Sequence, residues 1–310
     1  MTVPPMPPPP ATPSPTELVN PATTGIDQVP TAELLAMINA QDALVPGAVA
    51  GVIPALAGLV DAAVAGLAAG GHVHYVGAGT SGRLGVMDAA ELLPTYGIPA
   101  GVVIAHLAGG DEALVRAIED VEDDERAGAL TVEGVGPHDV VIGLAASGGT
   151  PFVGAALRAA RAAGAVTALV TSNPNARLAG LADHLLVADT GPEAVTGSTR
   201  MKAGTAAKLI LNSFSTAVMI RRGHTFSNLM VDMVPTNAKL RLRSIRMIGQ
   251  ATGISPTEAE GALSLCGDVK TSVVFVLAGL SGPDGAERAR AALRQTGGFV
   301  RQALEIVGRG

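Results

Sequence analysis

The sequence predicts an α/β fold in which helices flank a parallel, doubly wound five-stranded sheet, followed by a small helical C-terminal domain. The main observation is a series of short, continuously apolar segments that alternate with segments of helical periodicity. Strands buried on both faces have this pattern, because covering helices connect parallel neighbours. The expected strands are residues 72–77, 101–105, 139–144, 166–171 and 184–187.

Helices are expected wherever apolar residues recur with a period of about 3.6. Thr31 is a possible N-cap of the first helix, and Gly223 separates two long helices as a left-handed C-terminal residue. The expected helices are residues 31–40, 46–69, 84–93, 112–119, 151–163, 199–222, 226–250, 256–265, 271–280 and 284–295, with a last one after Gly297 and Gly298.

The chain of 310 residues divides into three regions. Residues 1–15 are rich in proline and cannot form a core, so we expect a disordered tail. Residues 16–250 contain the N-terminal helices and the sheet, and they form the predicted main domain. Residues 251–310 form the predicted small helical domain.

Composition narrows the class of protein. Apolar residues make up 48% of the chain and aromatic residues 2%, so Ala, Val, Leu and Ile must build the core. The formal net charge is −6 and no cluster of Lys and Arg forms a basic face, which argues against nucleic acid as a partner. No secretion signal and no apolar run of about 20 residues is visible. We therefore expect a cytoplasmic protein without a membrane partner.

Metal-ligating residues are sparse in the sequence. Cys266 is the only cysteine, so neither an internal disulfide nor a Cys-based zinc site can form. His72 and His74 alternate on an expected strand, and we interpret them as ordinary, partly buried strand residues. The six histidines show no metal-ligand spacing, so no metal site is expected.

Two glycine-rich loops, residues 77–83 and 146–151, each follow an expected strand. Glycines let the backbone approach an anion, and N–H groups at a helix start and nearby hydroxyls donate to it. Two such loops in one parallel sheet predict a small phosphorylated ligand, although glycine also serves tight packing at such turns. The first loop lacks the spacing of a dinucleotide-binding or P-loop motif. The candidate binding residues are Gly79, Thr80, Ser81, Arg83, Ser147, Gly148 and Thr150.

Two glutamates are candidate acid/base groups, each with a plainer alternative. Glu91 follows the first loop and has strongly apolar flanks, and desolvation there would raise the pKa of its carboxyl and favour a proton donor. By itself, however, such a residue is more often on the surface of an amphipathic helix. Glu122 lies in an acidic run that by itself indicates a solvated helix end.

The connection between the last strand and the next long helix contains further candidate substrate ligands. Ser198 and Thr199 would bind substrate or act as N-caps. Arg200 and Lys202 in the first helical turn oppose the helix dipole, which indicates an anion held between them or an acidic partner surface. Glu193 would bind sugar hydroxyls or pair with one of these cations.

Longer motifs resemble a known family. The two glycine-rich loops are similar to those of a sugar isomerase (SIS) domain, which binds phosphosugars. Three more specific segments resemble the N-acetylmuramic acid 6-phosphate etherase family, and Asn20-Pro21 fits this family as well. The resemblance runs from about residue 16 to the C-terminus. The specific segments are Asp88–Gly97, Val195–Thr205 and Asn228–Leu240.

The resemblance implies an SIS-type fold and an etherase activity. The family cleaves the D-lactyl ether of N-acetylmuramic acid 6-phosphate to N-acetylglucosamine 6-phosphate and D-lactate, in amino-sugar catabolism and cell-wall recycling. The resemblance implies no metal or organic cofactor, a phosphosugar as the small-molecule partner, and a homodimer. The family's catalytic glutamates correspond to Glu91, as proton donor to the lactyl oxygen, and Glu122, as a second acid/base group.

Two alternatives share the predicted fold. An aldose–ketose phosphosugar isomerase would also use a carboxylate at C2 of the sugar, but it would not release lactate. A non-catalytic phosphosugar-sensing regulator needs the loops but not both glutamates, and it would favour a second SIS domain or a DNA-binding segment. The presence of both Glu91 and Glu122 favours the enzyme.

Overall fold

The computed structural model of the protein describes residues 13–233 and 237–308. The chain forms two compact units: the first extends to residue 87 and resumes over residues 103–212, and the second contains residues 88–102 and 213 onward. Helices α4 (Gly79–Tyr96) and α8 (Lys202–Arg221) each contribute residues to both units. Most of the predicted proline-rich tail, residues 1–12, lies outside the described residues.

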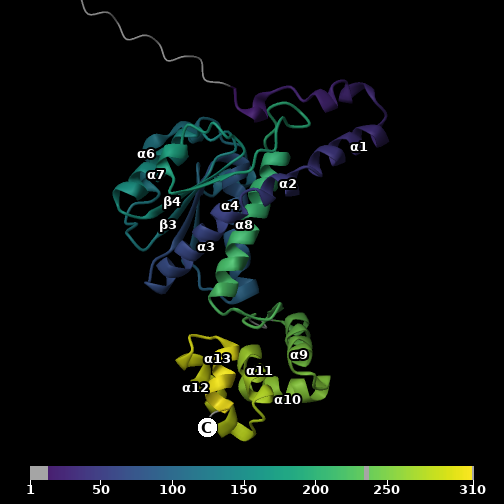
Figure 1. The fold of residues 1–310 in the computed structure, drawn as a ribbon, viewed down its shortest axis with the longest axis vertical. Helices are drawn as coiled ribbons and strands as arrows, with labels where there is room; N and C mark the ends of the chain where they lie inside the picture. The colour runs from purple at the N-terminus through teal and green to yellow at the C-terminus, as the bar shows by residue number, and fades with distance from the viewer. Residues whose placement is uncertain (1–12, 234–236, 309–310) are drawn as a thin grey trace, which may run out of the picture. The chain divides into compact units, whose positions relative to one another are not determined.

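The first unit is built around a five-stranded sheet in which all neighbouring strands are parallel (Figure 1). The strand order is β2-β1-β3-β4-β5, so the direction of winding reverses between β1 and β3. Ligands of open α/β sheets bind at the carboxyl ends of the strands at such a switch point. The predicted α/β fold is confirmed. The strands are β1 (Val73–Gly77), β2 (Val103–Leu107), β3 (Val140–Leu144), β4 (Val166–Thr171) and β5 (His184–Val187).

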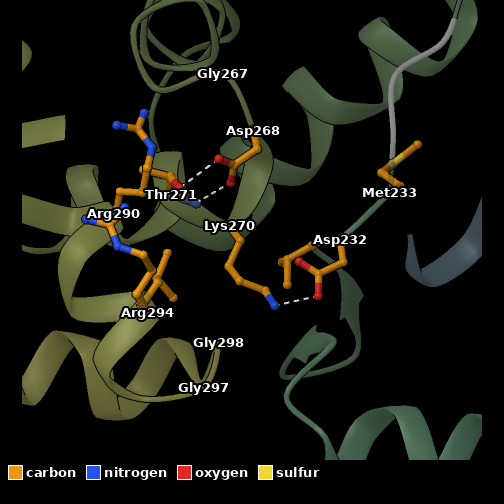
Figure 2. A pocket seen from close by; sticks show the side chains of 12 residues that line it. Asp232, Met233, Gly267, Asp268, Lys270, Thr271, Arg290, Arg294, Gly297 and Gly298 are labelled. Carbon is orange, nitrogen blue, oxygen red and sulfur yellow. Dashed lines mark hydrogen bonds and ion pairs between the residues drawn. The ribbon is translucent and has the colours of Figure 1, made fainter. Parts of the chain in front are cut away.

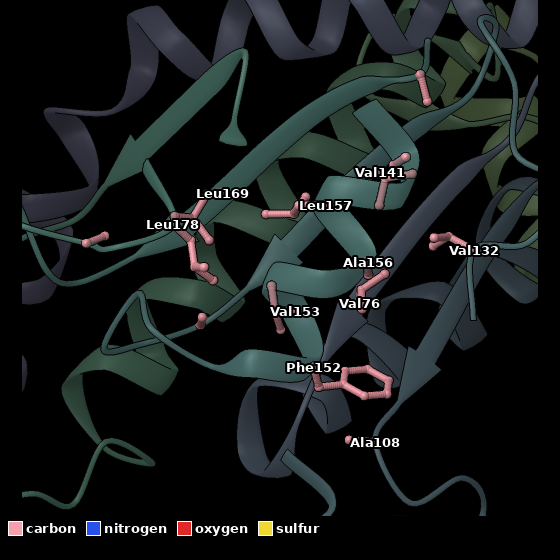
Figure 3. Close-up of a cluster of buried hydrophobic side chains, with 14 residues drawn as sticks. Val76, Ala108, Val132, Val141, Phe152, Val153, Ala156, Leu157, Leu169 and Leu178 are labelled. Atoms are coloured by element: carbon pink, nitrogen blue, oxygen red, sulfur yellow. The ribbon is translucent and has the colours of Figure 1, made fainter. Parts of the chain in front are cut away.

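Helices cover both faces of this sheet. Gly85 of α4 lies over one face, where an added Cβ would be 3.1 Å from the Cβ of Tyr75. The next residue in β1, Val76, points to the opposite face and packs with helix α7 (Pro151–Ala162) in a buried apolar cluster (Figure 3). Every residue of β1 and β3 is buried, as predicted for continuously apolar strands. Other members of the cluster are Val141, Phe152, Val153, Ala156, Leu157 and Leu169.

Two predicted helices that lie wholly in the first unit are wrong in their extent. The helix expected over residues 46–69 is divided into α2 (Val45–Ala50) and α3 (Ile53–Ala68), and α3 is bent by 59° relative to the helical stretch over residues 31–50. Pro54 lies in the first turn of α3, where backbone N–H groups have no acceptor within the helix. The missing N–H of proline therefore costs no hydrogen bond, and a new helix can begin there. The helix expected over residues 112–119 ends as α5 (Glu112–Val115), because Arg116 has an extended backbone.

Short elements complete the first unit. Helix α1 (Thr31–Asp42) confirms the first predicted helix, but Thr31 is its first helical residue and the N-cap is Pro30. The acidic run around Glu122 forms a 3-10 turn, η4 (Val121–Asp123), followed by helix α6 (Glu125–Leu130). The remaining 3-10 turns are η1 (Pro15–Glu17), η2 (Pro21–Thr23), η3 (Ile26–Gln28) and η5 (Ala179–Leu181).

The second unit is mainly helical and has an apolar core of its own. The predicted short C-terminal helices are confirmed: α10 (Pro256–Cys266), α11 (Val269–Leu277), α12 (Gly282–Gln295) and α13 (Val300–Gly308). Helix α9 (Ala238–Thr252) packs against α10 and α11, so the compact unit differs from the domain expected to begin at residue 251. The core includes Val231, Ile248, Leu263, Val273, Ala289 and Val300.

The helix expected over residues 226–250 is wrong in its first part. Strands β6 (Thr225–Phe226) and β7 (Leu229–Met230) form an antiparallel hairpin there. Ser227 has a φ of 54°, the left-handed conformation that such a tight turn requires. The prediction of Gly223 as a left-handed C-terminal residue is confirmed: it is the second residue after α8 and has a φ of 81°, and His224 N donates to Met219 O at 3.0 Å.

Helix α8 is long and apolar enough to cross a membrane by length and composition alone. The bent helices over residues 31–68 pass the same test as a pair. The core helices of soluble proteins also pass it, and more than half of the apolar window in α8 is buried within the protein.

Candidate functional site

The first glycine-rich loop is shaped by a close backbone approach. A Cβ on Gly77 would lie 2.8 Å from the Cα and N of Gly82, so the end of β1 and the first turn of α4 meet at a distance that only glycine permits. Gly79 has a φ of 53° at the helix start. Helix α4 therefore begins inside the loop and not at residue 84 as predicted. Thr80 and Ser81 lie in its first turn, partly exposed, where helical N–H groups favour an anion.

Arg83 is held by the protein at the end of α5. Its Nε donates to Ala113 O and its Nη2 donates to Arg116 O, both at 2.8 Å. These carbonyls belong to the C-terminal turn of a short helix, where a cation is favourable. A phosphate contact by Arg83 stays a prediction.

Hydrogen bonds to the carbonyl oxygens of residues 146–149 hold the second glycine-rich loop in place. Ala146 O accepts from Thr171 Oγ1 at 3.1 Å, and Ser147 O accepts from Asn173 Nδ2 at 2.8 Å. The carbonyls of Gly148 and Gly149 accept from Leu178 N and Arg177 Nη2, each at 3.1 Å. Carbonyl oxygens would repel an anion, and here they are bonded within the protein. The sequence-based argument missed the residues at the end of β4 and directly after it that hold this loop.

The first turn of α4 and the end of β3 line one narrow pocket. Ser81 lies there with Ala145 and Ala146, with Thr171 at the end of β4, and with Ser172 directly after it. The start of α8 closes the pocket with Ala203. The lining therefore comes from the carboxyl ends of β3 and β4 and from the helix that follows β1, beside the switch point of the sheet. Ser147, Gly148 and Thr150 follow in the same loop, and Ser147 is exposed.

The predicted anion at the start of α8 is a side chain of the protein. Glu193 is fully buried, and its two carboxylate oxygens accept from the N–H groups of Lys202 at 2.9 Å and Ala203 at 3.0 Å. The helix starts at Lys202, so the predicted start at Thr199 is wrong, and Glu193 supplies the cap that was expected from Ser198 or Thr199. A carboxylate is well suited to this position because it opposes the positive end of the helix dipole. The roles of Glu193, Ser198 and Thr199 toward substrate stay predictions.

Lys202 is buried in a polar network with the N-terminal segment. Its Nζ donates to Gln41 Oε1 at 3.1 Å, and the same oxygen accepts from Asn20 Nδ2 at 2.7 Å. Burial lowers the pKa of Lys202, while the carboxylate of Glu193 opposes this effect. The sequence analysis did not predict this network. It noted Asn20-Pro21 only as part of the family resemblance.

The two candidate acid/base residues are both exposed. Glu91 lies on α4 within the second unit, and Glu122 lies on η4 within the first. The apolar flanks of Glu91 predict a desolvated carboxyl, but within this chain the Glu91 side chain is exposed.

A larger pocket of about 480 Å³ lies in the second unit and contains none of the predicted site residues (Figure 2). Its cations are paired: Lys270 with Asp232, and both Arg290 and Arg294 with Glu287. His224 Nδ1 lies 2.7 Å from the Asp232 carboxylate. With its positive charges compensated, this pocket is a weaker candidate for an anionic ligand than the glycine-rich loops.

Comparison with known proteins identifies the family. A family model described as the glucokinase regulatory protein N-terminal SIS domain matches residues 55–161. The N-acetylmuramic acid 6-phosphate etherase of Cutibacterium acnes is 50% identical over 293 residues, which are 94% of this chain and 95% of that relative. The etherase of Thermobifida fusca is 53% identical over 265 residues (85% and 87% of the two chains), and that of Mesorhizobium japonicum is 48% identical over 288 residues (92% of each). The chain therefore belongs to the N-acetylmuramic acid 6-phosphate etherase family.

Proposed function

We propose that this chain cleaves the D-lactyl ether of N-acetylmuramic acid 6-phosphate and releases N-acetylglucosamine 6-phosphate and D-lactate. The observation that carries the proposal is the 50% identity with an etherase over 94% of the chain. Such an enzyme needs a phosphosugar site, and the two glycine-rich loops beside the switch point supply the geometry for one.

The chemistry is an elimination followed by addition of water. In the open-chain sugar, the C1 aldehyde acidifies the proton at C2, and a carboxylate removes it. The lactyl oxygen leaves C3 with a proton from a carboxylic acid; water then adds to the unsaturated aldehyde, its oxygen bonding to C3 while a proton returns to C2. We propose Glu91 as the proton donor and Glu122 as the second acid/base group, and the exposure of both side chains supports access by substrate.

We place the sugar phosphate at the two glycine-rich loops. Ser147 is exposed there, and the Thr150 hydroxyl makes no capping bond to α7 although Thr150 is the N-cap residue of that helix. Both hydroxyls are therefore available to donate to phosphate oxygens. The first loop would add Gly79, Thr80, Ser81 and Arg83, and the start of α8 would add Ser198 and Thr199.

We also propose that the protein acts as a homodimer. Large apolar side chains are exposed on the N-terminal helices, at Leu35, Leu44 and Ile53. Side chains of this kind are typical of surfaces that a second subunit covers. Light scattering after size-exclusion chromatography should give twice the chain mass of 30.9 kDa, and a monomer would contradict the proposal.

The deciding assay is D-lactate release from N-acetylmuramic acid 6-phosphate by the purified protein. We expect release by the wild type and nearly none by the folded Glu91→Gln and Glu122→Gln variants, which keep the shape of the side chain but lose the titratable proton. Asp123→Asn is a matched control, because Asp123 is the exposed neighbour of Glu122 on the same turn. Absence of lactate with a folded wild type would reject the etherase, and ketose formation in its place would indicate an isomerase.

Ser147→Ala should mainly raise KM, and an unchanged KM would remove Ser147 from the phosphate site.

A further inference from the structure

A cluster of polar side chains lies on the first unit away from the glycine-rich loops. His72 and Asp139 directly precede strands β1 and β3, at the amino ends of these strands, and His74 is the second residue of β1. The loops follow the carboxyl ends of the same strands. Strands of this length separate the two ends by about 16 Å, so the cluster is not part of the proposed catalytic site.

The three side chains converge on one point. One ligand atom from each of His72, His74 and Asp139 lies within 4.8 Å of the others, and this is the one such group of His, Cys, Asp and Glu among residues 13–233 and 237–308. His72 Nδ1 is 3.3 Å from Asp139 Oδ1. The alternation of residues 72 and 74 along an extended chain puts both rings on the same side of the sheet.

Neighbouring groups hold two of the three side chains in place. Asp139 accepts from His72 N at 2.6 Å and from Gly136 N at 2.7 Å, which fixes its carboxylate. A ring nitrogen of His74 lies 2.9 Å from Nε2 of His106 in β2, and the two rings stack with an interplanar angle of 6°. An outer partner on a histidine ring is a common feature of metal sites, because it sets the orientation of the ligand.

We propose that His72, His74 and Asp139 bind one divalent transition-metal ion of the Zn²⁺ type. Two imidazoles and one carboxylate are a ligand set that suits Zn²⁺, Co²⁺ or Ni²⁺ better than Mg²⁺ or Ca²⁺. His74 and Asp139 are each 8% exposed, whereas half of the His72 side chain is exposed. The exposed His72 provides the entry path, and water completes the coordination.

Binding requires only a small local closure. Ligand atoms of tetrahedral zinc are about 3.4 Å apart for bond lengths near 2.0–2.1 Å, compared with separations of up to 4.8 Å in the cluster. The half-exposed His72 ring has room to rotate toward the ion. The bound ion would connect the starts of β1 and β3, two neighbouring strands that are distant in sequence. Its role is therefore to stabilise the fold, not to act on the phosphosugar.

The test uses tag-free, metal-stripped protein titrated with Zn²⁺ by calorimetry and with Co²⁺ by visible absorption. We expect one equivalent to bind, and a rise in Tm of about 5 °C at free Zn²⁺ a hundredfold above Kd. His72→Gln should weaken binding by at least about tenfold. His138→Gln is the matched control, since His138 is exposed and adjacent to Asp139 but is not a member of the cluster. A chelator should reverse the rise in Tm.

Several outcomes would overturn the proposal. These are the absence of saturable binding at one equivalent, equal affinity in wild type and His72→Gln, or a loss of binding in His138→Gln alone. If His72→Gln proves unfolded, protection of wild-type His72 from a histidine-modifying reagent by Zn²⁺ replaces it, and lack of protection rejects the site. Lactate release at moderate temperature is measured separately, so failure of the metal site and failure of the etherase assignment are distinguishable.

Discussion

Replacement of Gly148 by alanine is the sharpest test of how the second loop is built. Gly148 has a φ of +70°, and an added Cβ would lie 2.2 Å from the Cβ and 2.8 Å from the Cα of Ala176. Ala176 cannot easily move away, because Leu178 N donates to Gly148 O and Ala176 N donates to Asn173 O. The substitution therefore adds backbone strain and an overlap with a fixed segment.

Both contributions can be estimated. A left-handed backbone costs a residue with a Cβ about 1–2 kcal/mol. Overpacking of a well-packed site costs about 1–3 kcal/mol more. We expect Gly148→Ala to lower the free energy of unfolding by about 2–5 kcal/mol, as measured by urea denaturation of the folded variant.

Alanine substitutions at two other glycines of the glycine-rich loops separate the backbone strain from the steric overlap. Gly79 has a φ of +53° but open space around an added Cβ, so Gly79→Ala should cost only the backbone share of about 1–2 kcal/mol. An added Cβ on Gly149 would approach the end of the flexible Arg177 side chain, at 3.0 Å from Nη2. Because the Arg177 side chain can shift, Gly149→Ala should lower the free energy of unfolding less than Gly79→Ala or Gly148→Ala does. A loss in Gly148→Ala no greater than that in Gly79→Ala would refute the packing argument.

Three further substitutions test the core, the cap of α8 and the acid stability. Leu157→Ala, at a fully buried position of the α7 cluster, should lower the free energy of unfolding by about 2–5 kcal/mol in urea. Glu193→Gln, which leaves one carboxamide oxygen to accept from two N–H groups, should cost about 1–3 kcal/mol; an unchanged urea midpoint would argue against the cap. Burial raises the pKa of Asp183, but hydrogen bonds from Thr167 outweigh it and lower the pKa below its usual value. The folded protein thus releases this proton more readily than the unfolded chain, and the resulting stabilisation is lost as the pH falls; the stability difference between wild type and Asp183→Asn should therefore shrink between about pH 5 and about pH 3.

Much of the fold follows from local signals in the sequence. The strands are continuously apolar because both faces of the sheet are covered, and each predicted strand corresponds to an observed one. The glycine-rich loops could be placed at strand ends because Gly77 and Gly82 mark a turn too tight for other residues. Their positions at the switch point then followed from the alternation of strands and helices.

Other features depend on contacts that no local pattern reveals. The hairpin over residues 225–230 overlaps the helix expected over residues 226–250, because its turn uses Ser227, a residue that does not mark a left-handed position as glycine does. The second loop is held by Thr171, the last residue of a different strand, and by Asn173 just after it, and only the sheet brings them near. The convergence of His72 and His74 with Asp139 likewise depends on the pairing of β1 with β3.

At the start of α8 the sequence correctly indicated the need for an anion, but it left open whether a ligand, an acidic partner surface or Glu193 supplies it. Cations beside the positive end of a helix are unfavourable, so the sequence indicated a nearby anion. The structure supplies that anion as Glu193, several residues before the helix and fully buried. Because Lys202 is in turn bonded to Gln41, a direct contact of either side chain with substrate would require breaking a buried hydrogen bond. The exposed Ser147 can bind without that cost, so we expect variants at Ser147 to affect KM more than stability and variants at Glu193 to affect stability first.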